Sequence, residues 1–144
     1  NGQFHETKEV EFNPIIKELV EDFQEIYEHK NLHVEVEENA VCKIHINESL
    51  ANILITNLLK NAMIHTPNEG SITIRVQSTG ITFTNSTDGN ALDQSRLFTR
   101  FYQADNKKSD SNGLGLAIVQ SIVHLYHFHI SYSFDGKHRF DLRF

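Results

Sequence analysis

Two lines of side chains between residues 50 and 66 limit how this chain can fold. Asn57, Asn61 and His65 recur at every fourth position, so on a helix they form one polar line. Apolar residues form a second line beside it, with the spacing of a helix that packs on a core (Leu50, Leu54 and Leu58). We therefore expect a helix that lies over a sheet and turns one polar edge toward a cavity.

The amides of this polar line have two interpretations. Amide oxygens are hard, neutral ligands, which suit a Mg²⁺ ion that already carries phosphate oxygens. Asn57 and Asn61 are equally compatible with an ordinary solvated helix surface, because short motifs have low specificity. The pattern by itself leaves both interpretations open.

Length and composition predict one globular domain. The chain has 144 residues, of which 39% are hydrophobic and 22% charged, as in soluble proteins with a substantial core. No apolar run reaches membrane-spanning length, and the start does not resemble a signal peptide. Since the first residue is Asn1 rather than Met, we expect a piece of a longer protein. The single Cys42 predicts a reducing compartment and a place in the core.

Charge argues against a nucleic-acid partner. The net charge is −6, whereas nucleic-acid-binding proteins normally present a basic face. Residues 1–40 hold eleven of the nineteen acidic residues and three of the thirteen basic ones. The remainder carries ten basic and eight acidic residues, so this part is where we expect an anionic ligand.

Local signals predict the first elements. Residues 1–8 are expected to be a linker, and Val10 and Phe12 indicate a short strand. Asn13 and Pro14 have the residue types of an N-cap and a first helical position, so a helix should follow and run to Lys30.

The central part has two strands, a long helix and a hairpin. Apolar alternation predicts strands at residues 32–36 and 42–46. Asn47 should cap the long helix, which should end near His65 because Pro67 removes a donor and Gly70 supplies the turn. Strands with apolar alternation follow at residues 72–76 and 81–83, and then a loop at 85–92.

The last third contains two helices, a loop and a hairpin. Residues 97–102 predict a short apolar helix, and residues 103–112, which lack large apolar side chains, predict a mobile loop. A helix should then run to Tyr126, and strands near 130–134 and 140–144 should close the chain. This order predicts an α/β (α+β) two-layer sandwich, in which three main helices cover one face of a mixed, mostly antiparallel sheet.

The segment Gly113-Leu114-Gly115-Leu116 at a helix start can cradle phosphate, because glycines let backbone N–H groups approach an anion. Alone this signal is weak and compatible with an ordinary glycine-containing loop.

Four features occur in order along the chain: the amide-bearing helix, the loop after a hairpin, the Leu-Phe-x-x-Phe-Tyr segment and the glycine segment. In this order the chain resembles the ATP-binding catalytic domain of bacterial two-component sensor histidine kinases. That family shares a superfamily with DNA gyrase, MutL mismatch-repair proteins and the large heat-shock chaperone ATPases.

The resemblance extends from about Val10 to Phe144. Residues 57–66 resemble the family's asparagine box, 97–102 its phenylalanine box, and 113–118 its second glycine box. It implies a catalytic domain at residues 9–144. It also implies that residues 1–8 link this domain to an upstream dimerisation and phosphoacceptor domain.

The resemblance also implies a site for ATP and Mg²⁺. Asn61 would bind Mg²⁺, Asn57 would contact phosphate or the water shell of the ion, and His65 would lie near the phosphates or ribose. Asn85 falls where the family has an aspartate that accepts from the adenine amino group. Gly89 falls on the second glycine of that box.

Further implied positions lie in and beside the lid, residues 103–112. Arg100, Lys107 or Lys108 would reach the phosphates, and Arg100 would act with Asn61 in catalysis. The remaining implied nucleotide contacts are Tyr102, Gly113, Leu114, Gly115 and Leu116, of which the glycines would supply backbone donors.

The sequence departs from the family pattern at four places. Asn85 is neutral where the family has a carboxylate, although its oxygen can still accept a hydrogen bond. Thr87 and Ser111 stand at glycine positions, and Thr87 brings a β-branched side chain where unusual backbone angles are expected. The glycines that often precede the penultimate strand are replaced by residues 127–129. Each change is expected to weaken nucleotide binding without removing a required group.

The leading functional hypothesis is therefore phosphoryl transfer from ATP to a histidine on the upstream domain. The chain has no His-Glu-x-x-x-Pro pattern, so we expect it to bind nucleotide but not to phosphorylate itself. Through the acceptor domain the partner would be a response regulator. The parent would be a homodimeric inner-membrane sensor, with this domain on the cytoplasmic side and without direct contact with membrane or nucleic acid.

Two other hypotheses remain open. The gyrase branch hydrolyses ATP with a glutamate one residue before the metal-binding asparagine, but Lys60 occupies that position here. A degenerate domain that binds a partner protein but little ATP would explain Thr87, Ser111 and the missing glycines.

Overall fold

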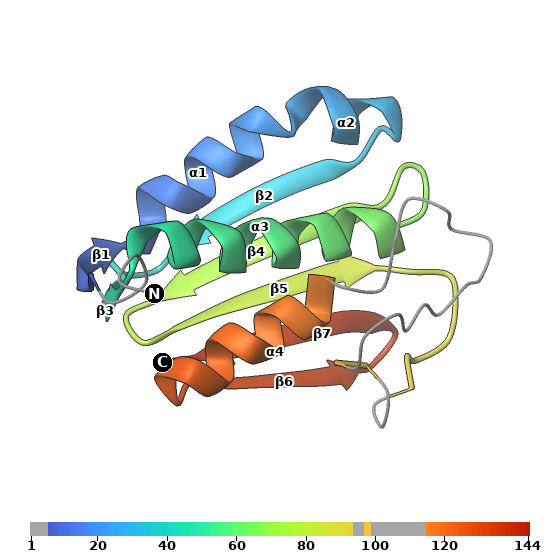
Figure 1. Cartoon of the computed structure of the whole chain (residues 1–144). Coiled ribbons are helices and arrows are strands. Elements are labelled where there is room, and N and C mark those ends of the chain that lie inside the picture. Colours follow the sequence, from blue (N-terminus) through green and yellow to red (C-terminus); the bar gives the residue numbers. More distant parts are fainter. Residues whose placement is uncertain (1–5, 94–96, 99–114) are drawn as a thin grey trace.

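The computed structural model describes residues 6–93, 97–98 and 115–144, which form two layers (Figure 1). One layer is a five-stranded sheet in the order β2-β4-β5-β7-β6. Its strands are β2 (His33–Glu38), β4 (Ser71–Gln77), β5 (Gly80–Ser86), β6 (His129–Phe134) and β7 (Lys137–Arg143). The β2–β4 pair is parallel and the other pairs are antiparallel.

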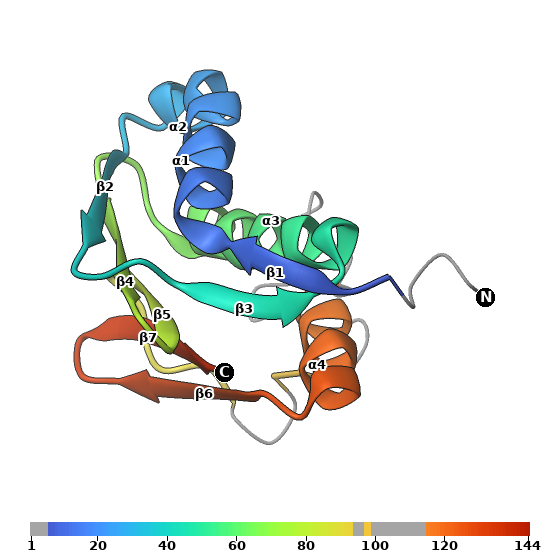
Figure 2. The same ribbon diagram turned by 90° about the vertical axis from the view of Figure 1, so that its left-hand side faces the viewer.

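The second layer consists of helices on one face of this sheet. Figures 1 and 2 show them on the same side: α1 (Phe12–Asp22), α3 (Glu48–His65) and α4 (Gly115–Tyr126). A short helix α2 (Gln24–His29) follows α1, and the strands β1 (Lys8–Glu11) and β3 (Lys43–Ile46) pair as a separate ribbon. The predicted two-layer sandwich is confirmed. Among the described residues, no helix is both long and apolar enough to cross a membrane.

The core lies between the layers, as the apolar periodicity predicts. Leu50, Leu54 and Leu58 of α3 are buried. Alternate residues of the central strands are buried beneath them, among them Ile72, Ile74, Ile81, Phe83, Phe140 and Leu142. Cys42 is also buried, and this burial raises the pKa of its thiol to about 11.

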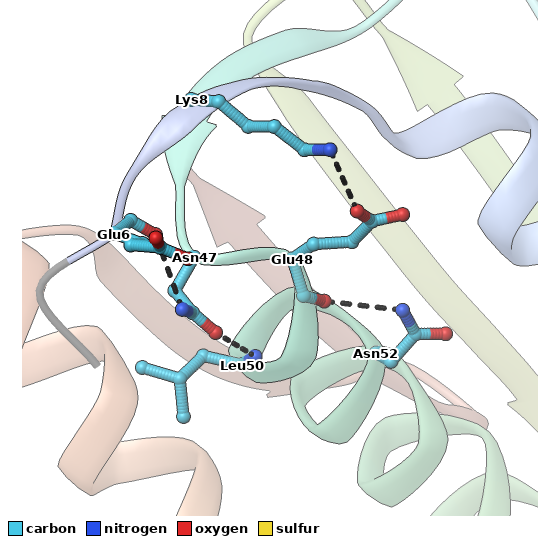
Figure 3. Close-up of polar contacts among 6 residues, drawn as sticks. All are labelled: Glu6, Lys8, Asn47, Glu48, Leu50 and Asn52. Atoms are coloured by element: carbon cyan, nitrogen blue, oxygen red, sulfur yellow. Dashed lines mark hydrogen bonds and ion pairs between the residues drawn. The ribbon is translucent and has the colours of Figure 1, made fainter. Parts of the chain in front are cut away.

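Polar contacts hold the start of α3, and Figure 3 shows those that involve Glu6 and Lys8. Asn47 caps the helix as predicted, because its Oδ1 accepts from the backbone N–H of Leu50 at 3.0 Å. Its Nδ2 donates to the carbonyl of Glu6 at 3.1 Å, and its backbone N–H donates to the Tyr126 hydroxyl. Lys8 Nζ lies 2.9 Å from a carboxylate oxygen of Glu48. The ribbon of β1 and β3 is thereby tied to the helix start.

The turn after α3 uses Gly70 differently from the prediction. Glu69, not Gly70, has the positive φ, at 68°. A Cβ on Gly70 would lie 2.5 Å from Thr66 Cγ2 and 2.7 Å from Ser86 Oγ. Glycine is therefore needed here because two other segments approach closely, rather than for backbone freedom.

The first helix starts and ends differently from the prediction. Phe12 begins α1 instead of lying in a strand, and Glu11 rather than Asn13 is the N-cap. Asn13 is buried in the first turn, where its Oδ1 accepts from the N–H of Cys42 and its Nδ2 donates to the carbonyl of Ala40. The predicted single helix is also interrupted at Phe23, between α1 and α2.

Two helices end with a non-glycine residue in the left-handed region. Asn31 has φ 55° and His127 has φ 61°. In both cases the next residue donates back to the helix: Leu32 to the carbonyl of Tyr27, and Phe128 to that of Val123. These are Schellman caps, in which glycine is the usual residue. His127 therefore forms its turn without the glycine that the family pattern led us to expect.

The end of β5 also differs from the prediction. This strand continues through Asn85 and Ser86, which were predicted to be loop residues. Asn85 pairs with Ile72 of β4 and with His138 of β7, so it lies in the middle of the sheet. Leu97 and Phe98 form a turn, whereas the rest of the predicted helix and the predicted lid at 103–112 fall outside the described residues.

Candidate functional site

The polar line of α3 meets the start of α4 at Asn57 and the ring of His138 in β7 at His65. Asn57, Asn61 and His65 are all half-buried. A Cβ on Gly115, at the start of α4, would lie 3.2 Å from Asn57 Oδ1. The absence of a side chain at Gly115 therefore lets the start of α4 approach the amide-bearing helix. Two motifs that are far apart in the sequence meet at this point.

Two buried amide atoms near this line have no hydrogen-bond partner among the described residues. They are Asn61 Nδ2, a donor, and Asn85 Oδ1, an acceptor. The Asn85 orientation is assigned from its other amide atom, because Nδ2 donates to the carbonyl of Ser86 at 3.2 Å. An unsatisfied buried polar group costs about 1–3 kcal/mol, so folded proteins retain few of them. These two atoms are therefore candidates for contact with a polar ligand.

A cluster of rings lies next to Asn85. His138, its partner across the β5–β7 pair, is buried. The ring of His138 meets that of His65 edge-on, with 6.3 Å between centroids. His138 Nδ1 lies 2.7 Å from the Tyr132 hydroxyl, which accepts from the N–H of Leu92 at 2.9 Å. Burial lowers the pKa of His138, which favours the neutral ring.

Sequence analysis missed His138 and Tyr132 as site residues. The available signal was strand alternation, because His138 has the same parity as the buried Phe140 and Leu142. A histidine on that face of the strand has to lie under the helices. By contrast, His29, His33 and His45 are exposed.

The loop after β5 is not strained at Thr87. The positive-φ residues other than glycine in the described part of the chain are Asn31, Glu69 and His127, so the unusual backbone expected at Thr87 is absent. Instead, the Thr87 hydroxyl accepts from the N–H of Gly89 at 3.0 Å and closes a local turn. Gly89 itself is exposed.

Of the remaining predicted site residues, Leu116 is half-buried on α4 and packs against the core. The others lie outside the described residues: Arg100, Tyr102, Lys107, Lys108, Gly113 and Leu114. Lys60, at the position of the gyrase-branch glutamate, is exposed on α3. Within residues 6–93, 97–98 and 115–144, no three His, Cys, Asp or Glu side chains form a group that could hold a metal ion.

Comparison with known proteins identifies the family. Residues 46–144 match the family described as histidine kinase-, DNA gyrase B-, and HSP90-like ATPase. The chain belongs to this family. It is 37% identical over 135 residues to the heme sensor protein HssS of Staphylococcus epidermidis, an alignment that covers 91% of this chain and 30% of that protein. The chain thus spans about a third of the length of the curated relatives it matches.

Solved structures show the same fold. The catalytic domain of histidine kinase ThkA superposes with a TM-score of 0.79 at 21% identity, covering 95% of this chain and 93% of that domain. ThkA in complex with the response regulator protein TrrA gives a TM-score of 0.75 at 20% identity, covering 94% of this chain and 40% of that one. The resemblance to the ATP-binding catalytic domains of sensor histidine kinases is confirmed.

Proposed function

We propose that this chain is the ATP-binding catalytic domain of a sensor histidine kinase. In this function the γ-phosphoryl group of ATP·Mg²⁺ passes to a histidine on a separate dimerisation domain. Membership of the ATPase family and similarity to a sensor protein support the proposal. The structural observation that carries it is a pair of buried amide atoms, Asn61 Nδ2 and Asn85 Oδ1, that have no hydrogen-bond partner in the part of the chain that the structure describes.

The residues present fit both parts of the ligand. Asn85 Oδ1 can accept from the amino group of adenine, because it is buried, is an acceptor and lacks a partner among the described residues. The amide of Asn61 offers Mg²⁺ a hard, neutral oxygen and leaves Nδ2, which has no partner among residues 6–93, 97–98 and 115–144, for a phosphate oxygen. Since one amide is a weak site by itself, the phosphates would supply further ligands to the ion.

Other residues would position the phosphates. Asn57 Oδ1 lies against the start of α4 at Gly115, so we assign Asn57 and that helix start to the phosphate end of the ligand. His65 would lie near the phosphates or ribose. Arg100, Lys107 and Lys108 remain proposed phosphate contacts, and residues 103–112 remain the proposed lid. Catalysis would consist mainly of positioning and charge neutralisation.

The proposed partners follow from the reaction. Residues 1–8 would join the chain to the dimerisation and phosphoacceptor domain of a homodimeric parent. Through that domain the phosphoryl group would reach a response regulator, and the ThkA complex supports this kind of partner. We also propose that the parent is a membrane sensor with this domain on its cytoplasmic side, consistent with its similarity to sensor proteins.

An ATP-hydrolysing switch has less support. Such a mechanism needs a general base beside the metal-binding residue, and the neighbour of Asn61 is Lys60, which cannot accept a proton while it is charged. A degenerate, partner-binding domain is an outcome of the binding experiment below.

The first test is calorimetric titration with a non-hydrolysable ATP analogue, with and without Mg²⁺. We expect saturable, Mg²⁺-dependent binding that is lost in Asn61→Ala. Asn52→Ala is the matched control, because this α3 amide donates to the carbonyl of Glu48 and lies away from the site. A folded protein that binds no nucleotide at millimolar concentration would favour the degenerate partner-binding domain.

The second test is transfer of radiolabel from ATP. The chain alone should remain unlabelled, because it carries no acceptor pattern. Adding the separately purified dimerisation domain of the same parent should place the label on that domain. Label on this chain alone would contradict the proposal that the acceptor histidine lies elsewhere.

A further inference from the structure

His138 and Asn85 lie side by side under the helices. They are directly opposed across the β5–β7 pair, which places their Cβ atoms about 4.5–5.5 Å apart on the same face of the sheet. Both are nearly inaccessible, with 1% of Asn85 and 3% of His138 exposed. A buried histidine next to an amide oxygen without a described partner is unusual, because each polar atom there needs a hydrogen-bond partner.

One ring nitrogen of His138 is already occupied. Nδ1 lies 2.7 Å from the Tyr132 hydroxyl, and that hydroxyl accepts from the N–H of Leu92. The hydroxyl can donate its proton to Nδ1, and His138 is then a neutral imidazole with its proton on Nε2. Burial lowers the pKa of His138 and supports this neutral form.

The other ring nitrogen is turned away from Tyr132. Because Nδ1 faces Tyr132 of β6, Nε2 is the ring nitrogen that remains for another partner. His138 is directly opposed to Asn85 of β5, and its ring meets that of His65 of α3. The Nε2–H donor and the Asn85 Oδ1 acceptor therefore belong to residues that are directly opposed on one face of the sheet.

We propose that His138 donates to the base of the nucleotide and that the pair His138–Asn85 selects adenine. This inference rests on the proposed function. Adenine offers an amino donor flanked by ring-nitrogen acceptors, N1 and N7, so it matches the pair with two hydrogen bonds. Guanine and hypoxanthine carry an oxygen acceptor in place of that amino group and would face Asn85 Oδ1 with a second acceptor. Tyr132 acts as a positioning residue, because it fixes which nitrogen of His138 carries the proton.

Nucleotide analogues separate this role from a structural one. Calorimetry would compare ATP with 1-deaza-ATP and 7-deaza-ATP, each of which replaces one ring-nitrogen acceptor by C–H. Wild-type protein should bind one analogue about tenfold or more weakly than ATP, because a buried donor would lose its partner. His138→Phe should bind ATP more weakly and bind that analogue as well as ATP. His138→Gln, which keeps an N–H donor, should restore part of the discrimination.

Two further variants complete the test. Tyr132→Phe deletes only the hydroxyl and should reduce the ATP-to-analogue ratio, whereas His129→Phe, at an exposed position of β6, should leave the ratio unchanged. If His138→Phe does not fold, the wild-type ratios together with His138→Gln and Tyr132→Phe decide the question.

The outcomes distinguish the two proposals. ATP binding with no discrimination against either analogue, or with an unchanged ratio in His138→Phe, would overturn the role of His138 and leave the proposed function intact. A purely structural His138 would produce that second pattern, since both ligands would weaken equally. Absence of ATP binding by folded wild-type protein would contradict both proposals.

Discussion

The two ends of α3 use asparagine in opposite ways. At the first end both amide atoms of Asn47 are hydrogen-bonded, Oδ1 to the N–H of Leu50 and Nδ2 to the carbonyl of Glu6 (Figure 3). Toward the second end Asn61 Nδ2 is buried without a partner among the described residues, as is Asn85 Oδ1 on the sheet below. The same residue type therefore holds the fold together at one end and offers polar atoms at the other.

The difference separates stability from binding. A satisfied cap contributes about 0.5–2 kcal/mol to folding. An unsatisfied buried amide atom costs about 1–3 kcal/mol unless a ligand completes it. Residues of the first kind should therefore affect unfolding more than ligand affinity, and residues of the second kind should do the reverse.

The largest expected effect is on ligand affinity at the second end. Asn61→Ala should weaken Mg²⁺-nucleotide binding at least about a hundredfold, because the change removes the proposed metal ligand and a buried donor. Its free energy of unfolding without ligand should not fall, since the orphaned donor disappears. Calorimetry and denaturant unfolding measure the two quantities. A variant that loses stability and affinity in parallel would show that Asn61 is structural, and the contrast between the helix ends would fail.

The next effect is on stability at the first end. Asn47→Ala should lower the free energy of unfolding by about 1–2 kcal/mol, because it removes the cap of α3 and the tie to Glu6. Nucleotide affinity of the folded protein should change less than threefold. Urea unfolding gives the stability, and titration well below the unfolding midpoint gives the affinity. Asn47→Ser, which keeps a capping oxygen but loses the amide donor, should recover most of the loss.

The contrast also explains which features the sequence could predict. The cap at Asn47, the end of α3 and both hairpins follow from signals within a few residues, such as turn residues and apolar alternation. Asn13 was wrongly predicted to be the N-cap, because this capping residue type serves a long-range contact with Cys42, 29 residues away. Likewise, the pairing of Asn85 with His138 depends on sheet order. The motifs pointed to α3 and α4, but His138 carried no motif.

A smaller effect should appear in the pH dependence of stability near the second end. The folded-state pKa of His138 is lowered by burial below its ordinary value of 6.5. His138 therefore binds fewer protons in the folded protein than in the unfolded chain. Its contribution to the free energy of unfolding is present above pH 6.5 and is lost as the pH falls through the folded-state pKa. Urea unfolding of wild type and His138→Gln at pH 5 and pH 7.5 should show a smaller pH difference in the variant. Subtracting the variant removes the titration of the groups that lie away from His138. Equal pH differences would mean that His138 is not desolvated.

The smallest effect should come from the ion pair at the first end. Lys8 and Glu48 lie 2.9 Å apart, but their side chains are 66% and 58% exposed, so water and salt screen the attraction. The carboxylate of Glu48 raises the pKa of Lys8, so any contribution is present below the ordinary lysine pKa of 10.5 and is lost as the pH rises above it. At pH 7 Lys8→Ala should therefore leave the unfolding midpoint within the scatter of repeated measurements, in low and in high salt. A clear drop in low salt that high salt abolishes would show that charge, and not the Asn47 amide, joins the ribbon of β1 and β3 to α3. In that case Asn47→Ala should also lower the free energy of unfolding by less than the loss of a helix cap predicts. The first end of α3 would then depend on charge, whereas the second end is proposed to depend on a ligand.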